Sequence, residues 1–312
     1  MTRKNNPSPA DRIVTCGREA VLGAPVIRWD QPGGWACPHP RGRSACTQHD
    51  PALNEAPTRP LKRYRIEDPE SAYRELTRTV HQLVLHYDVC FTSWQCHQLL
   101  QDSTCKGSHF YLDLDGTVYQ TCDLYWKTNT APADDRRGNE RAVHVEMANL
   151  SWQARAEESD LYGLKQDAYI CSRGRWRLNL PEPYRRRLRD PAYIPAPARH
   201  HKTRGYFSRR INGRLVRMWD FTEAQYRSLI ELCRGVHQLL PRIRLQVPFN
   251  PRTHRTPLDR LPDFDRFEGI LGHAHVQAGR VDGVRCKYDP GSAFDWGRLR
   301  RAFSRLSPQN PK

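Results

Sequence analysis

The segment that decides the fold lies in the middle of the chain and reads Ser108-His109-Phe110-Tyr111-Leu112-Asp113-Leu114-Asp115-Gly116-Thr117-Val118-Tyr119-Gln120. Its aromatic, leucine and β-branched residues form two short runs, which predict two strands. The Asp115-Gly116 pair between the runs is typical of a tight hairpin turn, because glycine readily adopts the positive φ that such a turn needs. We therefore predict an antiparallel pair of strands within a larger sheet.

Apolar runs on either side of this hairpin predict an α/β fold. Further strands are expected at 82–86, 142–147 and 270–273, where short runs are largely apolar. Helices are expected from 69 with Asp68 as N-cap, from Thr92 or Ser93 to 101, from Thr222 to 240, and near 298–306. Thr222 and Gln225 have the spacing of a capping box, and Pro241 ends that helix. We expect one domain in which helices flank a central mixed β-sheet.

Composition divides the chain into three parts. Residues 1–67 are rich in Pro, Gly and Arg and predict an irregular N-terminal extension, in which only 13–14 and 26–29 resemble short strands. Residues 68–312 form the predicted domain. An Arg-rich segment with Pro clusters, residues 151–219, interrupts that domain and is expected to be an insertion with little regular structure.

The charge of the chain predicts an anionic partner. The 312 residues carry a net charge of +16, which favours binding to a polyanion or an acidic surface. We do not expect nucleic acid, because a basic flap over a substrate cleft, or a surface that holds anionic cell wall, explains the same arginines. No stretch approaches the length of a membrane span, and no apolar run follows the basic N-terminus. We therefore expect synthesis in the cytoplasm without a secretory signal, with the site of action left open.

Two histidines and an aspartate are candidate metal ligands. His86 ends an apolar run, His273 follows Gly272, and Asp289 stands in Lys287-Tyr288-Asp289-Pro290-Gly291. Two imidazoles and a carboxylate suit Zn²⁺ and leave its fourth position open. His275 is a rival ligand, because a continuing strand would point it the same way as His273. We favour His273, which follows the glycine.

Five stretches taken together resemble the zinc-dependent N-acetylmuramoyl-L-alanine amidase family, which includes the peptidoglycan recognition proteins of animals. They are Leu85-His86-Tyr87, the hairpin 108–120, Val145-Glu146-Met147-Ala148-Asn149, Phe221-Thr222-Glu223-Ala224-Gln225, and Gly272-His273 with 287–296. The resemblance covers about residues 80 to 304. It implies that His86, His273 and Asp289 bind Zn²⁺. It also implies that the enzyme cleaves the amide between N-acetylmuramic acid and L-alanine in peptidoglycan or a muropeptide.

Glu146 and Lys287 are the candidate catalytic residues. Amide hydrolysis needs a base for water and a proton for the leaving amine, and Glu146 fits both roles if it faces the metal. In an extended loop Lys287 and Asp289 share a face, so the lysine could stabilise the developing oxyanion. The alternative is a non-catalytic peptidoglycan-binding module of the same fold. Loss of a ligand would indicate that alternative, and no ligand is lost.

Several residues leave alternatives open. Cys90 and Cys96 resemble a disulfide loop beside the zinc strand of the animal recognition proteins, and two free thiols are the alternative. Cys37, His39, Cys46 and His49 fit a second zinc site poorly, because their spacing matches no regular finger. The sequence departs from the family at Ser108, where some members have a catalytic tyrosine, and in its long gap between His273 and Asp289. His109 and His144 are interpreted as structural or groove-lining residues.

Overall fold

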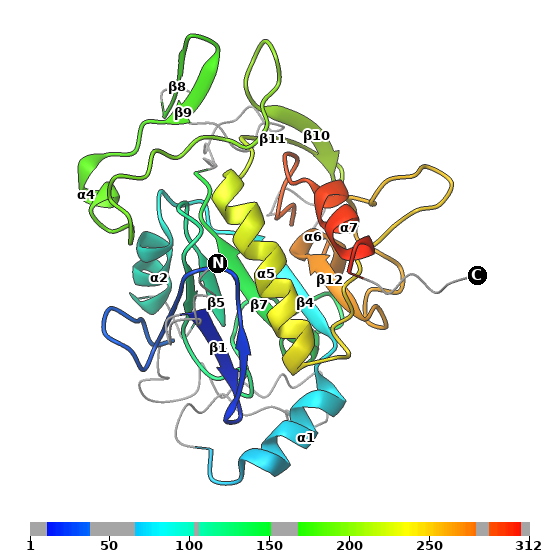
Figure 1. Cartoon of the computed structure of the whole chain (residues 1–312). Coiled ribbons are helices and arrows are strands. Elements are labelled where there is room, and N and C mark those ends of the chain that lie inside the picture. The colour runs from blue at the N-terminus through cyan, green and yellow to red at the C-terminus, as the bar shows by residue number, and fades with distance from the viewer. Residues whose placement is uncertain (1–10, 38–65, 103–105, 151–167, 279–286, 307–312) are drawn as a thin grey trace, which may run out of the picture.

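A six-stranded mixed sheet forms the centre of the computed structural model, which describes residues 11–37, 66–102, 106–150, 168–278 and 287–306 (Figure 1). Its strand order is β12-β4-β7-β5-β6-β3. The strands are β3 (Val26–Arg28), β4 (Gln82–Tyr87), β5 (Phe110–Leu112), β6 (Val118–Gln120), β7 (Ala142–Met147) and β12 (Gly269–Gly272). Only β5 and β6 pair antiparallel, as the hairpin predicts, and the other neighbours in this sheet are parallel. The predicted mixed α/β architecture is confirmed.

The burial of the two central strands explains why they could be recognised in the sequence as apolar runs. Every residue of β4 and β7 is buried, and a parallel strand covered on both faces is expected to be almost continuously apolar. The polar exceptions on these strands include His86 and Glu146, which lie opposite one another in register. Burying such groups is costly unless they are bonded or have a function. The exceptions therefore mark the candidate site.

The predicted helices are present. They are α1 (Pro69–Thr79), α2 (Ser93–Asp102), α5 (Glu223–Leu239) and α7 (Trp296–Ser304), with short α3 (Gly138–Arg141), α4 (Glu182–Arg185) and α6 (His273–Val276) beside them. Asp68 caps α1 by accepting from the Ser71 N–H, and Thr222 and Gln225 form the expected capping box of α5. Helix α5 crosses one face of the sheet (Figure 1). No helix among the described residues is both long enough and apolar enough to cross a membrane.

The N-terminal part requires a correction. The expected short strands at 13–14 and 26–29 are present, but residues 11–28 are not an irregular extension. Strands β1 (Arg12–Thr15) and β2 (Arg18–Val21) form a hairpin, and β3 joins the edge of the central sheet. Buried Ile13, Ala20 and Leu22 belong to the main core. The interpretation failed because strands this short alternate buried with exposed residues over too few positions to show a period. The possible site at Cys37, His39, Cys46 and His49 extends outside the described residues.

The Arg-rich insertion also contains regular structure. From residue 168 it includes two antiparallel hairpins, β8 (Tyr169–Ser172) with β9 (Arg175–Leu178) and β10 (Phe207–Ile211) with β11 (Arg214–Met218). Its aromatic residues pack as a small second core, in which the Tyr169 and Trp219 rings stack at 4.2 Å. Arginines occupy mainly the exposed positions of β9 and β10. That alternation explains why the segment reads as polar although it folds.

Candidate metal centre

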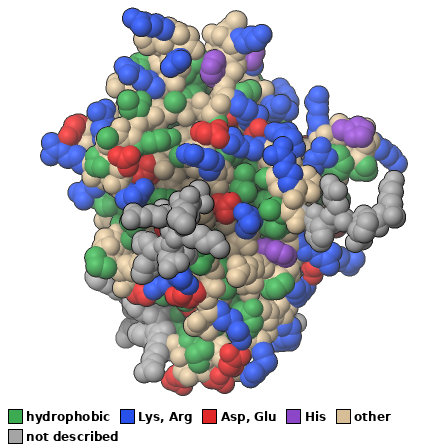
Figure 2. Space-filling view, in the orientation of Figure 1, with side chains coloured by type: hydrophobic (Ala, Val, Ile, Leu, Met, Phe, Trp, Pro, Cys, Tyr) green, Lys and Arg blue, Asp and Glu red, His purple; other side chains and the backbone are tan. Residues whose placement is uncertain are grey.

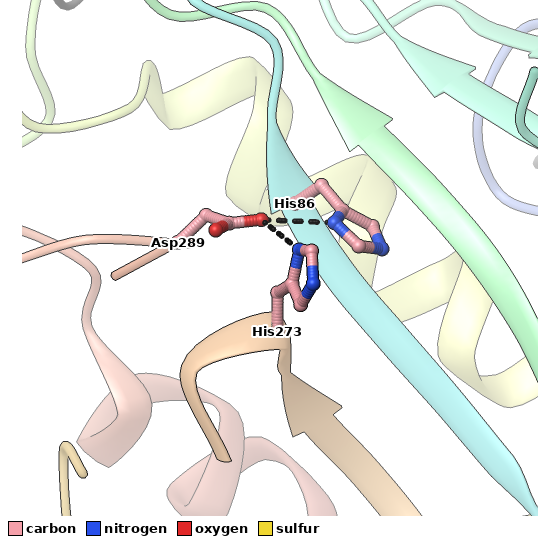
Figure 3. Close-up of side chains that lie close together, drawn as sticks. All are labelled: His86, His273 and Asp289. Carbon is pink, nitrogen blue, oxygen red and sulfur yellow. Dashed lines mark hydrogen bonds and ion pairs between the residues drawn. The ribbon is translucent and has the colours of Figure 1, made fainter. Parts of the chain in front are cut away.

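The three expected ligands meet at one edge of the central sheet. His86 is near the end of β4, and His273 directly follows β12, the parallel neighbour of β4. Parallel neighbours end at the same edge, so the two imidazoles lie side by side. The Nδ1 atoms of His86 and His273 lie 2.8 and 3.1 Å from the same oxygen, Oδ2 of Asp289 (Figure 3). The ligand atoms of the three residues are all within 4.8 Å of one another.

Glycines allow the loop that carries Asp289 to approach the sheet. A Cβ at Gly272 would lie 2.4 Å from Cδ of Pro290 and 3.0 Å from the carbonyl oxygen of Asp289. That same carbonyl accepts a 3.0 Å hydrogen bond from the Ala274 N–H. On the other side, Gly291 has a φ of +98° and a Cβ there would lie 2.1 Å from Sδ of Met218. Side chains at either glycine would displace the loop, so the two glycines position the carboxylate.

Burial and the neighbouring groups set the protonation states of His86 and Asp289. His86 and His273 are almost inaccessible. Burial is the largest effect on His86 and lowers its pKa to about 4, so its ring is neutral near pH 7. Burial alone would raise the pKa of Asp289, but the two neighbouring histidines hold it well below its usual value. A neutral imidazole and an ionised carboxylate are the forms that bind a divalent metal.

His275 does not join the cluster, so the expectation that it shares a direction with His273 is wrong. The chain does not continue as a strand after Gly272 but turns into helix α6, which points the two histidines apart. Nδ1 of His275 accepts from the Gly272 N–H at 3.0 Å, and its Nε2 lies 2.8 Å from the Pro257 carbonyl oxygen. Both nitrogens therefore hold backbone in place.

Glu146 and Lys287 act electrostatically on the same edge of the sheet. Glu146 is buried on β7 directly opposite His86. Burial, followed by the negative charge of Asp289, raises its pKa to about 8, while the charge of Lys287 acts in the opposite direction. The same lysine also lowers the pKa of His86. Tyr288, between Lys287 and Asp289, packs on Tyr87 with the ring centroids 5.6 Å apart, as expected where successive residues face opposite ways.

Two residues that support the histidines were not recognised from the sequence. Nε2 of His86 lies 3.2 Å from Nδ1 of His144, and Nε2 of His273 lies 2.9 Å from Oε1 of Gln277. His144 had only a structural or groove-lining interpretation. Its position was a usable signal, because His144 and Glu146 are two apart on one strand and so share a face. Gln277 gave no signal, because its position depends on helix α6.

Cys90 and Cys96 lie in the loop and helix that follow β4. Both are buried free thiols in this structure, and they form a hydrogen bond that contributes to the raised pKa of Cys96. The structure therefore has two free thiols here and not a disulfide.

Comparisons with known proteins relate part of the chain to one family. Residues 76–188 match the family model described as N-acetylmuramoyl-L-alanine amidase. The matched segment includes His86 and Glu146 and ends before His273, Lys287 and Asp289. Among curated proteins, none matches the chain.

Two solved structures show a weak likeness. One is AmpDh3 from Pseudomonas aeruginosa in complex with anhydromuramic pentapeptide, 14% identical with a TM-score of 0.38 over 72% of this chain. The match spans only 60% of that protein. The other is a selenomethionine derivative of AmpD, 13% identical with a TM-score of 0.37, over 72% of this chain and 86% of that chain.

Proposed function

Because the chain is related through residues 76–188 to the N-acetylmuramoyl-L-alanine amidase family, we propose that it is a zinc-dependent hydrolase of peptidoglycan. The bond cleaved is the amide between N-acetylmuramic acid and L-alanine, in peptidoglycan or in a soluble muropeptide. One observation carries this proposal. The imidazoles of His86 and His273 converge on one carboxylate oxygen of Asp289, beside a buried glutamate.

The donor set fits a metal ion. If Nε2 of His273 donates to Gln277 and Nε2 of His86 donates to His144, each neutral ring presents an Nδ1 lone pair to Asp289. Two lone pairs and a carboxylate oxygen this close together form a donor set that suits a divalent cation. His86, His273 and Asp289 would therefore hold Zn²⁺ and leave one position open. A zinc ion in such a site supplies a Lewis acid for the amide carbonyl and lowers the pKa of water.

Glu146 is the proposed proton carrier. Its carboxylate takes a proton from the attacking water and returns it to the leaving amine. A pKa of about 8 in the buried site allows the group to hold the proton until the amine leaves, whereas the first step needs the ionised carboxylate. A bound cation would bring this pKa down towards the ordinary range.

Lys287 is the proposed electrostatic assistant. Its ammonium group acts on both His86 and Glu146, so it lies within electrostatic reach of the reacting groups. A fixed positive charge there stabilises negative charge that develops on the amide oxygen. The lysine therefore completes a set of five residues in which only Lys287 and Asp289 come from the same segment of the chain.

Digestion of purified peptidoglycan tests the proposal. The full-length protein is assayed for bound zinc and for release of stem peptides that begin with a free L-alanine. The matched variant is Glu146→Gln, which keeps the size of the side chain and should retain zinc while losing cleavage. Intact amide linkages despite one equivalent of zinc would contradict catalysis. Binding to peptidoglycan without cleavage by the wild type would instead favour the non-catalytic binding module.

A further inference from the structure

A cavity lies against the segment of chain that follows Asp289. It has a volume of about 270 Å³ and lies between β10, the loop after α5 and the start of α7. One wall is the segment Ser292–Gly297, which follows closely after Asp289. None of the proposed ligands or catalytic residues lines it. The proposed chemical steps therefore use no residue of this cavity.

Three arginines around this cavity lack counter-charges. Arg209, Arg255 and Arg300 line it, and among the described residues none of them forms an ion pair or a side-chain hydrogen bond. Arg199 also lines the cavity, but it is paired with Asp220 at 2.7 Å and with Asp295 at 3.4 Å. Asp295, the acidic residue that lines the cavity, is therefore already paired with Arg199. Three positive charges remain for a ligand.

The floor of the cavity is aromatic and ordered by packing. Phe294 and Trp296 are buried, and the centroids of their rings lie 4.6 Å apart. At the rim, the Arg300 guanidinium lies 4.1 Å from the ring centroid of Phe249, which restricts where it can point. Figure 2 shows Lys and Arg side chains gathered around β10 and α7. Apolar ring faces below cationic groups suit an organic molecule that carries an anion.

We propose that this cavity binds a phosphate group attached to a small organic moiety. A guanidinium matches phosphate oxygens with paired donors, and the match is charge-assisted. Three unpaired guanidiniums exceed what one carboxylate can neutralise, which favours the dianion. The volume lies near the lower end for ligand pockets, so one phosphorylated unit fits. That unit is either a free phosphorylated metabolite or one repeat of a phosphate-containing polymer.

Calorimetric titration of the full-length protein tests this site. The probes are sn-glycerol 3-phosphate, poly(glycerol phosphate) and, as the carboxylate comparison, glycerate. The test variant replaces Arg209, Arg255 and Arg300 by alanine. The matched control replaces Arg74, Arg175 and Arg177, which are exposed, lie outside the cavity and change the net charge equally.

The site predicts saturable binding of glycerol 3-phosphate that the test variant weakens by at least about tenfold, since each lost bond to a charged group is substantial. The control should weaken it less than about twofold, because it alters only the general field. Stronger binding of the polymer per phosphate, lost in the test variant, assigns the polymer as the source, whereas equal or weaker binding assigns the metabolite. Equal losses in both variants, equal affinity for glycerate, or no saturable binding would each overturn the proposal.

Discussion

His144 is the residue whose role changes most between sequence and structure. Its Nδ1 lies 3.2 Å from Nε2, the outer nitrogen of His86, and this contact orients the ring of the proposed ligand. We expect His144→Phe to weaken zinc affinity by about 10- to 100-fold, the usual effect of losing a bond to a metal-bound histidine. Competition with a chelating dye measures the affinity directly. His144→Asn, which keeps an acceptor, should recover part of the loss, and unchanged affinity in the phenylalanine variant would refute the positioning role.

The choice between His273 and His275 as ligand can be tested by a pair of substitutions. Asp289→Ala should abolish stoichiometric zinc, because the carboxylate is the point on which both imidazoles converge. His275→Ala should keep zinc and lose about 1–3 kcal/mol of stability, because the Gly272 N–H would lose its buried acceptor. Zinc analysis and thermal unfolding of the two proteins separate these effects. Zinc retained without Asp289 but lost without His275 would mean that the ligand set is wrong.

Asp113 gives the fold a pH dependence of its own. It is fully buried, its Oδ1 accepts from the Ser93 and Leu114 N–H groups, and burial raises its pKa to about 7. A pKa raised above the unfolded value makes stability greatest at low pH and lowers it as pH rises to about 7. Relative to Asp113→Asn, the wild type should therefore lose about 2–3 kcal/mol between about pH 5 and pH 8. Urea unfolding at each pH measures this difference, and a parallel dependence in both proteins would show that Asp113 does not cause it.

At the scale of elements, the junction of β12 and α6 determines where the carboxylate lies. We expect Gly272→Ala to reduce zinc affinity and to cost about 1–3 kcal/mol, because the new methyl group meets Pro290 at 2.4 Å. Gly23→Ala is the matched control, since its Cβ would meet only the flexible side chain of Glu231 at 3.4 Å. The control should stay within about 0.5 kcal/mol of the wild type. Normal zinc affinity in Gly272→Ala would show that the loop tolerates displacement.

The elements that the sequence predicts well are those whose pattern is local and long. Strands β4 and β7 are continuous apolar runs, and α5 carries a capping box and a regular buried face. The hairpins β1–β2 and β8–β9 were not predicted, because four-residue strands with exposed arginines show no clear period. Helix α6 was also missed. Its turn depends on the contact between the Ala274 N–H and the Asp289 carbonyl, which is not visible in the local sequence.

At the scale of the molecule, the site exists only because the fold is parallel at its centre. His86 and Asp289 are 203 residues apart in the chain yet lie within 2.8 Å. The identities of the proposed ligands could be taken from the family resemblance and from the chemistry of zinc. Their proximity could not, because it follows from the pairing of β12 with β4 and from the packing of the Asp289 loop on Gly272. A sequence motif thus indicates which residues are the proposed ligands, while the fold determines whether they lie close together.

The charge of the whole molecule makes a last prediction about how it meets its substrate. A net charge of +16 should draw the protein to anionic cell wall over distances that salt shortens, from about 10 Å at 0.1 M to about 3 Å at 1 M. We therefore expect sedimentation of Glu146→Gln with insoluble peptidoglycan to fall steeply over this range. Cleavage of a small soluble muropeptide by the wild type should change much less, because contacts within the site are short and partly buried. Binding to peptidoglycan that does not weaken with salt would instead mean that contacts within the candidate metal centre recognise the wall. The excess of arginine would then have no role in this binding.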